Sequence, residues 1–285
     1  MLGEVAQALQ VPADAVLVDA TFGLGGHSRA LLQHLGPDGR LLVCDADPAA
    51  MLRARRLALE DPRLMVLGGN FAHMEAMVAG LGLTGTVHGL VADLGLSSAQ
   101  LADRSRGFSF RERGRLDMRF DPEQGETAAQ WLQRATEGQI AQVLRDYGQE
   151  PACNRIARAL VQARSKAPLE TTSQLAEVVA HALGGGYGRH HPATRTFQAL
   201  RMQVNSELRV LAELLDSLPA ILKPGGRACM ISFHSLEDRL VKQTVRARRD
   251  VLGELGKPLR PTAQECAANP RARSAIMRVV ERLSS

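Results

Sequence analysis

Short apolar segments alternate with helix-patterned segments through the first hundred residues of this 285-residue chain. Buried strands are predicted in "VLVD", "RLLVCDADP", "RLMVLGGNF" and "VHGLVADLGLSS". Helical patterns such as "SRALLQHL" and "AAMLRARRLAL" separate them. Strands joined by helical crossovers pair in parallel and carry helices on both faces of the sheet. The sequence therefore predicts an α/β fold built on a mostly parallel sheet.

The alternation stops in the middle of the chain. Residues 104–193 are polar, rich in arginine and helical in pattern. The α/β character returns with a long helix predicted around "TFQALRMQVNSELRVLAELLDSL", and the turn in "LKPGGRACMISF" leads into another apolar strand. We therefore expect one discontinuous α/β domain, residues 1–103 and 194–285, interrupted by a helical insertion at 104–193.

The net charge and the amino-acid composition indicate which chemical class of partner the chain binds. The formal net charge is +5, and all but four of the 35 basic residues are arginine, whose planar fork suits phosphate and bases. A biased genome composition would explain the arginine excess equally well. The four cysteines form no CxxC pair, and no apolar run is long enough for a bilayer or shaped like a signal peptide. We expect a cytoplasmic protein without a structural metal or a membrane anchor.

The glycine-rich stretch "DATFGLGGHS" follows the first strand. Gly23, Gly25 and Gly26 allow a sharp turn and a close approach of a ligand, and the N–H groups of the next helix point to the same place. A dinucleotide fingerprint would place its third glycine where Ser28 stands, so a ligand containing adenosine but no pyrophosphate fits better. A plain strand-to-helix turn is the alternative.

Acidic residues end the second and fourth predicted strands. A carboxylate at Asp45 would accept hydrogen bonds from ribose hydroxyls, and Asp47 competes for this role. Asp93 would orient a target amino group or accept the proton that the amine sheds, although it would also serve to cap a turn. Phe71 is a candidate for packing against adenine and His27 for donating to a ligand carboxylate. By themselves, these two positions are more typical of a core ring and a helix-start histidine.

The stretch "DRSRGFSFRERGRLDMRF" interleaves arginines with Phe108, Phe110 and Phe120. Its arginines are Arg104, Arg106, Arg111, Arg113, Arg115 and Arg119. Cations between aromatic rings suit single-stranded RNA, whose bases stack and whose phosphates pair. The alternative is a folded loop with buried rings and with arginines paired to Glu112 and Asp117.

The motif "SFHSLEDR" follows the late strand and places Ser232, His234 and Ser235 at its carboxyl end. No nucleophile-elbow context surrounds them, so a hydrolase triad is excluded, and they become candidates for substrate contact. His190 and His191 read as loop residues.

Several motifs together resemble the bacterial RsmH/MraW family. They are "DATFGLGGHSRALL", "CDADPAA", "VADLGLSSAQLADRSRGFSF", "LDMRFD", "HPATRTFQALRMQVNSEL", "LKPGGR", "ISFHSLEDRLVK" and "NPRARSAIMRV", in order along nearly the whole chain. Members are S-adenosylmethionine-dependent methyltransferases that modify N4 of one cytosine in 16S ribosomal RNA of the small ribosomal subunit. The resemblance implies a class I methyltransferase, with a Rossmann-like sheet and an inserted helical domain that recognises substrate.

The resemblance also implies site residues. Cofactor contacts carried over by position fall on Gly25, Gly26, His27, Asp45, Phe71, Asp93 and Gln100. Asp93 becomes the candidate catalytic residue. Because no aromatic clamp follows Asp93, we expect Phe108 or Phe110 to stack on the flipped base, with Arg106, Ser232 and His234 as further substrate candidates. Ala20 stands where the family generally has glycine, and we expect cofactor binding to tolerate its methyl group.

Three other functions share parts of this pattern. A nicotinamide-dependent oxidoreductase has a similar loop and acid, but the glycine spacing is against it. A non-catalytic RNA-binding factor would not need the loop, Asp45 and Asp93 together. A small-molecule methyltransferase would not need the arginine-rich insertion. The oligomeric state is left open, with a homodimer as one option.

Overall fold

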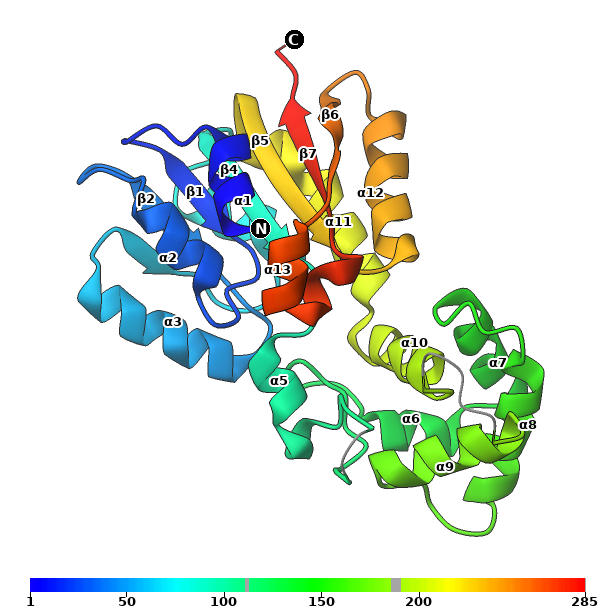
Figure 1. Cartoon of the computed structure of the whole chain (residues 1–285). Coiled ribbons are helices and arrows are strands. Elements are labelled where there is room, and N and C mark those ends of the chain that lie inside the picture. The colour runs from blue at the N-terminus through cyan, green and yellow to red at the C-terminus, as the bar shows by residue number, and fades with distance from the viewer. Residues whose placement is uncertain (111–112, 186–190, 285) are drawn as a thin grey trace. The chain divides into compact units, whose positions relative to one another are not determined.

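The computed structural model describes residues 1–110, 113–185 and 191–284. The chain divides into two compact units: Met1–Gly95 with Leu208–Ser285, and Leu96–Glu207 (Figure 1). The helical unit is thus wider than the insertion expected at 104–193. It gains α5 (Ser98–Ala102) at one end and α10 (Thr194–Asn205) at the other, and α10 contributes Phe197 and Leu200 to its core.

The first unit is built on a seven-stranded sheet in the order β3-β2-β1-β4-β5-β7-β6. Its strands are β1 (Val16–Asp19), β2 (Arg40–Val43), β3 (Leu64–Val66), β4 (Val87–Asp93), β5 (Leu222–Ser232), β6 (Leu252–Leu259) and β7 (Ile276–Arg282). The first five pair in parallel, whereas β7 pairs antiparallel with both β5 and β6. The α/β prediction is confirmed. Strands β6 and β7 were missed, because β6 is mostly exposed and has no apolar run, and both strands pair antiparallel instead of through a parallel crossover.

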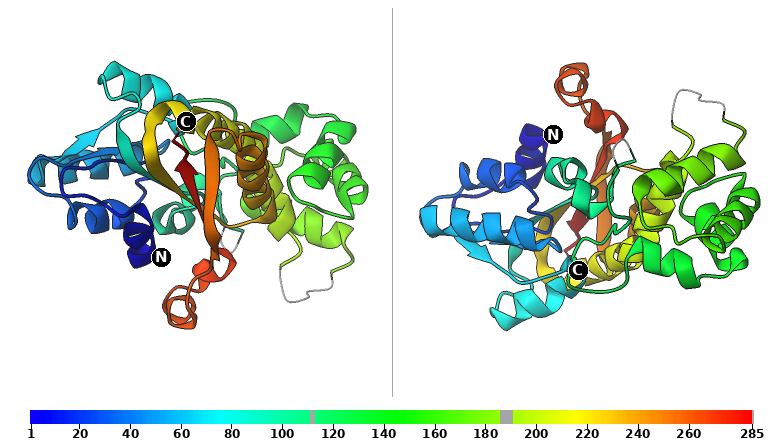
Figure 2. Two further views of the ribbon diagram at one scale, coloured as in Figure 1. Left: turned by 90° about the horizontal axis from the view of Figure 1, so that it is seen from above. Right: turned by 90° about the horizontal axis from the view of Figure 1, so that it is seen from below.

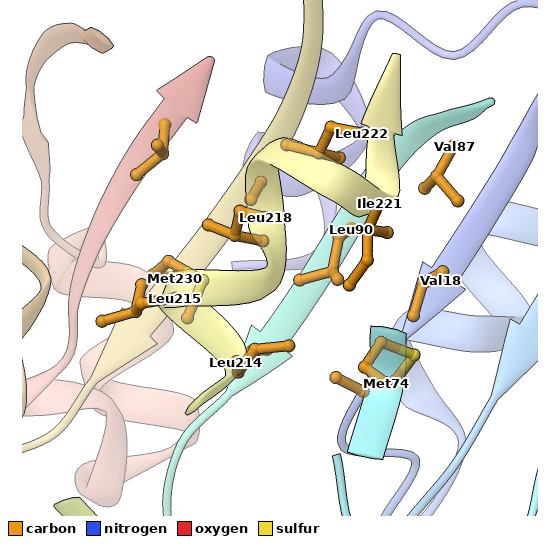
Figure 3. Packing of buried hydrophobic residues seen from close by; sticks show 14 of the residues in the cluster. Val18, Met74, Val87, Leu90, Leu214, Leu215, Leu218, Ile221, Leu222 and Met230 are labelled. Atoms are coloured by element: carbon orange, nitrogen blue, oxygen red, sulfur yellow. The ribbon is translucent and has the colours of Figure 1, made fainter. Parts of the chain in front are cut away.

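Helices cover both faces of this sheet (Figure 2). The helices are α1 (Leu2–Leu9), α2 (Gly26–Leu32), α3 (Pro48–Glu60), α4 (Met74–Gly80), α11 (Glu207–Ile221), α12 (Ser235–Ala247) and α13 (Ala263–Ala268). Helices α1, α2 and α3 bury their apolar sides in one core cluster with Leu17 and Val91, and α4, α11 and α12 do so in another with Val18 and Leu90. Figure 3 shows this second cluster, with α11 packed over β4 and β5. Successive residues of a strand face opposite sides, so β1 and β4 are buried from both.

The long helix predicted around "TFQALRMQVNSELRVLAELLDSL" is two helices. Ser206 adopts a left-handed conformation (φ 50°) and ends α10, after which α11 begins at Glu207. The side chain of Asn205 donates to Met118 O and accepts from Phe120 N, both at 2.7 Å. These bonds secure the end of α10 within the helical unit, which a periodicity argument cannot anticipate.

Among the described residues of the second unit, the regular elements are helices joined by loops, apart from one isolated bridge between Arg115 and Thr171. Besides α5 and α10 it contains α6 (Ala128–Arg134), α7 (Glu137–Asp146), α8 (Cys153–Arg164) and α9 (Thr172–Ala182). Capping boxes begin α5, α6, α7 and α9, each with Ser or Thr as N-cap and Gln three residues later. These local signals explain why the helical content of this region could be read from sequence. Among the described residues, no helix is both long and apolar enough for a bilayer.

Candidate active site

The glycine loop leaves β1 and enters α2. Gly23 (φ 52°) and Gly25 (φ 78°) adopt left-handed conformations that other residues rarely accept. A Cβ on Gly25 would also lie 2.8 Å from the Phe22 ring, which packs beneath the loop. Gly26 begins α2 and is exposed, and His27 follows it. The loop therefore presents Gly25, Gly26 and His27 at the carboxyl edge of the sheet, where ligands of open α/β sheets bind.

Asp19 lies fully buried beneath this loop, and sequence reasoning did not assign it. Its Oδ2 accepts from the Ser28 hydroxyl at 2.6 Å, and its Oδ1 accepts from Thr21 N at 3.1 Å. Burial raises the pKa of the Asp19 carboxyl. Two features of the sequence pointed to this pair: an acid as the last residue of an apolar strand, and a serine in place of the third glycine.

Asp45 follows β2 and faces the glycine loop. It accepts from Gly23 N at 2.7 Å and from Asp47 N at 2.8 Å, and burial raises its pKa to about 6. Asp47, the competing candidate, is the N-cap of α3: its side chain accepts from Ala49 N at 3.0 Å and is buried. The geometry favours Asp45 over Asp47 as the acid that faces a ligand.

Asp93 ends β4 next to His27. The main-chain N–H of Asp93 donates to the Thr21 hydroxyl at 2.7 Å, and its Oδ2 lies 3.6 Å from His27 Nε2. Among the described residues, Asp93 Oδ1 and His27 Nδ1 are buried atoms without a hydrogen-bond partner. A buried polar atom without a partner costs about 1–3 kcal/mol, and such atoms are rare in folded proteins. These two are therefore the atoms of the site most in need of a ligand.

Phe71 lies beyond the end of β3. It begins the short 3-10 helix Phe71–His73, which Asn70 caps by accepting from Ala72 N at 3.0 Å. One side of the ring packs against the core cluster that contains Met74 and Val18, and the residue stays partly exposed. Gly69 precedes it in a left-handed conformation (φ 86°), and a Cβ added there would meet no atom within 4 Å. A flat apolar group has room here.

Gln100 belongs to the helical unit. Its side chain accepts from Ser97 N at 2.9 Å and completes the capping box of α5, and the residue is 7% exposed. The α/β unit thus brings together the loop, Asp45, Phe71 and Asp93. A cofactor contact for Gln100 stays a prediction from the family resemblance.

The structure does not favour Phe108 for stacking on a base, and the choice between Phe108 and Phe110 stays a prediction. Phe108 is 7% exposed and belongs to the core of the helical unit, with Phe120 at 5.7 Å between ring centroids. A ring enclosed by other side chains has no free face for a base. Phe110 is partly buried on the same core, stacked on His191 at 4.4 Å and edge-on to Phe197 at 5.2 Å.

The arginine stretch is in part a folded loop, the alternative named for it. Arg106 donates to the carbonyls of Arg119 and Phe120, and Arg119 forms a two-bond pair with Asp117. These contacts close the loop on itself and give Arg106 a structural task. Arg111 and Glu112 of this stretch, and His190, lie outside the described residues.

The candidates in "SFHSLEDR" also have structural partners. Ser232 is 1% exposed, and its hydroxyl donates to Ile276 O at 3.4 Å across β5 and β7. His234 is the N-cap of α12: its Nδ1 accepts from Glu237 N at 3.4 Å, and its Nε2 lies 3.1 Å from Glu237 Oε1. Substrate contact by these two residues would have to coexist with those bonds. The sequence motif is therefore accounted for by a capping box with an imidazole in place of a hydroxyl.

Comparison with known proteins gives this arrangement a family. The model of the MraW methylase family matches residues 1–283. Relatives called "Ribosomal RNA small subunit methyltransferase H" are 46% identical in Thioalkalivibrio sulfidiphilus, 45% in Nitrosomonas europaea and 47% in Halorhodospira halophila. Each alignment covers 100% of this chain and 96%, 96% and 93% of those relatives, respectively. The resemblance inferred from the motifs is confirmed, and the chain belongs to the MraW methylase family.

Proposed function

We propose that this protein transfers a methyl group from S-adenosylmethionine to N4 of one cytosine in 16S ribosomal RNA of the small ribosomal subunit. The family and the names of its relatives support the reaction class and the RNA. The observation that carries the proposal is the pair of buried, partnerless atoms, Asp93 Oδ1 and His27 Nδ1, beside the glycine loop and Asp45.

The residues around the loop fit this cofactor. Asp45 uses two acceptor sites on main-chain N–H groups, and a carboxylate offers about four, so ribose hydroxyls can still donate to it. Phe71 and the open space at Gly69 accept a flat base such as adenine. The orphaned atoms of His27 and Asp93 suit the charged amino-acid end.

The chemistry divides between the cofactor and the protein. When bound, S-adenosylmethionine supplies an electrophilic methyl group that an amino nitrogen can displace in line. We assign to Asp93 the tasks of accepting a hydrogen bond from the target amino group and of taking up the proton that this nitrogen sheds, which its position at the end of β4 supports. No covalent enzyme intermediate is needed, because the exocyclic amine is itself nucleophilic once it is oriented. Alignment of the reacting atoms supplies much of the acceleration.

The substrate side of the site is proposed from charge and exposure. The basic charge of the chain and the exposed Arg113 and Arg115 of the helical unit favour an RNA partner. The insertion at 104–193 is accordingly proposed to recognise RNA. The chain's four cysteines are free thiols, which fits a reducing compartment, and we place the activity in the cytoplasm.

Three measurements test the proposal. Purified protein is incubated with S-adenosylmethionine labelled in its methyl group and with small-subunit RNA, and nucleosides are separated by mass spectrometry. Label in N4-methylated cytidine is the expected result, whereas label elsewhere or none would contradict it. Titration with NADH in place of S-adenosylmethionine addresses the oxidoreductase alternative. In cells lacking the gene, the modified cytidine should disappear and return on complementation.

A further inference from the structure

We propose that Thr21 is a positioning residue of this site: its hydroxyl fixes the end of β4 at Asp93, and buried Asp19 fixes Thr21. The inference rests on the proposed methyl transfer. It adds residues to which the sequence analysis gave no role, and it explains how the His27–Asp93 pair is held.

The first step concerns the edge between β1 and β4. Asp19 is the last residue of β1, in register with Val91, and Ala20 N donates to Val91 O at 2.9 Å. The chain then turns into the glycine loop. Asp93 N, further along β4, donates instead to a side chain, the Thr21 hydroxyl, at 2.7 Å. Thr21 thus extends the hydrogen bonding between the strands by one bond beyond the end of β1.

The opposite edge of β4 is held differently. There Asp93 is in register with Ile231 of β5, and Leu94 N donates to Ile231 O at 2.8 Å. Main-chain pairing therefore secures one edge of the Asp93 segment. On the other edge, a single side-chain acceptor provides the bond at Asp93.

The second step concerns what orients Thr21. The Oδ1 atom of Asp19 accepts from Thr21 N at 3.1 Å, and the Oδ2 atom accepts from the Ser28 hydroxyl at 2.6 Å. Asp19 and Ser28 are both fully buried, so the bond between them does not compete with solvent. Thr21 stands at the start of the glycine loop and Ser28 in the first turn of α2. One carboxylate therefore joins both ends of the loop.

The third step concerns the distance between His27 and Asp93. At 3.6 Å, His27 Nε2 and Asp93 Oδ2 are beyond hydrogen-bond range, so no direct bond sets their separation. His27 precedes Ser28 on α2, and Asp93 is bonded to Thr21. The chain of contacts from Ser28 through Asp19 and Thr21 to Asp93 consequently fixes where the two groups stand. Loss of a link would displace the acceptor from the reacting nitrogen.

The test compares Thr21→Val with Thr21→Ser. Valine keeps the shape of threonine but cannot accept from Asp93 N, whereas serine can. We expect Thr21→Val to lower kcat about 10–100-fold, since a displacement of about 1 Å can cost 10²-fold. The Kd for S-adenosylmethionine should change by a smaller factor than kcat, because Asp93 is only one of the proposed cofactor contacts while the loop and Asp45 stay in place. Thr21→Ser should keep most of the wild-type kcat.

Matched variants separate positioning from folding. Thr86→Val removes a hydroxyl that donates to Leu83 O at 2.7 Å in an exposed turn of the same unit, and it should leave kcat unchanged. Ser28→Ala removes the other bond to Asp19 and should lower kcat in the same direction by a smaller factor. If Thr21→Val folds poorly, Ser28→Ala and the melting temperatures of all variants still distinguish the two roles.

Amide hydrogen exchange at Asp93 N tests the hydrogen bond to the Thr21 hydroxyl without an activity assay. Exchange should be faster in Thr21→Val than in wild type and close to wild type in Thr21→Ser. The inference is overturned if this amide exchanges equally fast in all three proteins, or if Thr21→Val keeps normal kcat. It is also overturned if serine fails as badly as valine. If wild type transfers no methyl group, the proposed function fails, while the exchange rates still decide whether Thr21 holds Asp93.

Discussion

The α/β unit and the helical unit differ in how far the fold itself uses the side chains that are proposed for function. In the α/β unit, two residues proposed for function retain buried polar atoms without hydrogen-bond partners, Asp93 Oδ1 and His27 Nδ1, whereas Ser232 and His234 are bonded within the fold. In the helical unit, the proposed residues are occupied by the fold. Phe108 fills the core, and Arg106 donates to two carbonyls.

This difference shows which residue patterns in a sequence are good indicators of a functional site in the folded protein. At the strand ends of the α/β unit, Asp93 keeps an acceptor atom that a ligand can use, whereas Asp19 and Asp47 are satisfied by bonds within the unit. Arginine combines an apolar stem with a charged head, and phenylalanine is apolar, so a small helical unit can use both to close itself. An arginine–phenylalanine pattern alone is therefore a poor guide to an RNA-binding surface.

The largest effect is expected from Asp93→Ala. Loss of the carboxylate removes the acceptor for the target amino group and should reduce kcat about 10²–10⁴-fold, the usual contribution of a general base. Transfer of labelled methyl groups measures it. Asp14→Ala, an exposed acid of the same unit, is the control and should behave as wild type. Near-normal turnover in Asp93→Ala would contradict the proposed role of Asp93, and with it the difference in function between the two units.

Phe108→Ala should act on stability. Truncating a buried phenylalanine typically costs about 3–5 kcal/mol of unfolding free energy, and urea denaturation measures this cost. Phe110→Ala should cost less, since that ring is only partly buried. A stable Phe108→Ala protein that binds S-adenosylmethionine normally but fails to methylate RNA would restore the base-stacking role.

Asp45 should make cofactor affinity depend on pH. Only the ionised carboxylate offers all its acceptor sites, so the Kd for S-adenosylmethionine should rise about 10–100-fold as pH falls through about 6, the loss expected for hydrogen bonds to a charged group. Calorimetric titrations between neutral and acidic pH measure this, and Asp45→Asn should flatten the profile. An equally steep profile in that variant would assign the titration to another group.

The raised pKa of Asp45 also makes folding stability depend on pH, in the opposite direction to cofactor affinity. Because the folded-state pKa of Asp45 lies above its ordinary value, the folded protein holds a proton that the unfolded chain has lost. The stabilising contribution of the protonated group is full below the ordinary carboxyl pKa and is lost as pH rises through about 6. Affinity and this part of the stability should therefore change in opposite directions across that window.

His234→Ala should have the smallest effect. Removing the N-cap of α12 should cost about 1 kcal/mol of unfolding free energy, the usual value for a lost cap. His234→Ser should keep the stability, because serine caps as well as or better than histidine. Thermal unfolding of both variants checks this. If His234→Ser loses RNA methylation while its melting temperature is unchanged, the result would support a substrate contact by His234.

Much of the cofactor side was predictable from sequence. The loop at Gly25, an acid at Asp45 or Asp47 and the strand end at Asp93 follow from local rules: glycine where φ is positive, and acids at the carboxyl ends of parallel strands. Asp19 and Thr21 were not assigned, although they lie in the same motif. Their importance depends on bonds to Ser28 and Asp93, the second of which joins residues 72 positions apart.

By itself, the sequence determined the α/β class, the mostly parallel sheet, the glycine loop and the family, because periodicity, strand-end residues and long motifs are local or linear properties. Only the tertiary structure decided that Asp47 caps a helix while Asp45 faces the loop, that Phe108 is core, and that β6 and β7 complete the sheet. The physical reason is that a polar or aromatic side chain takes whichever partner lies within reach, and distant parts of the chain supply those partners.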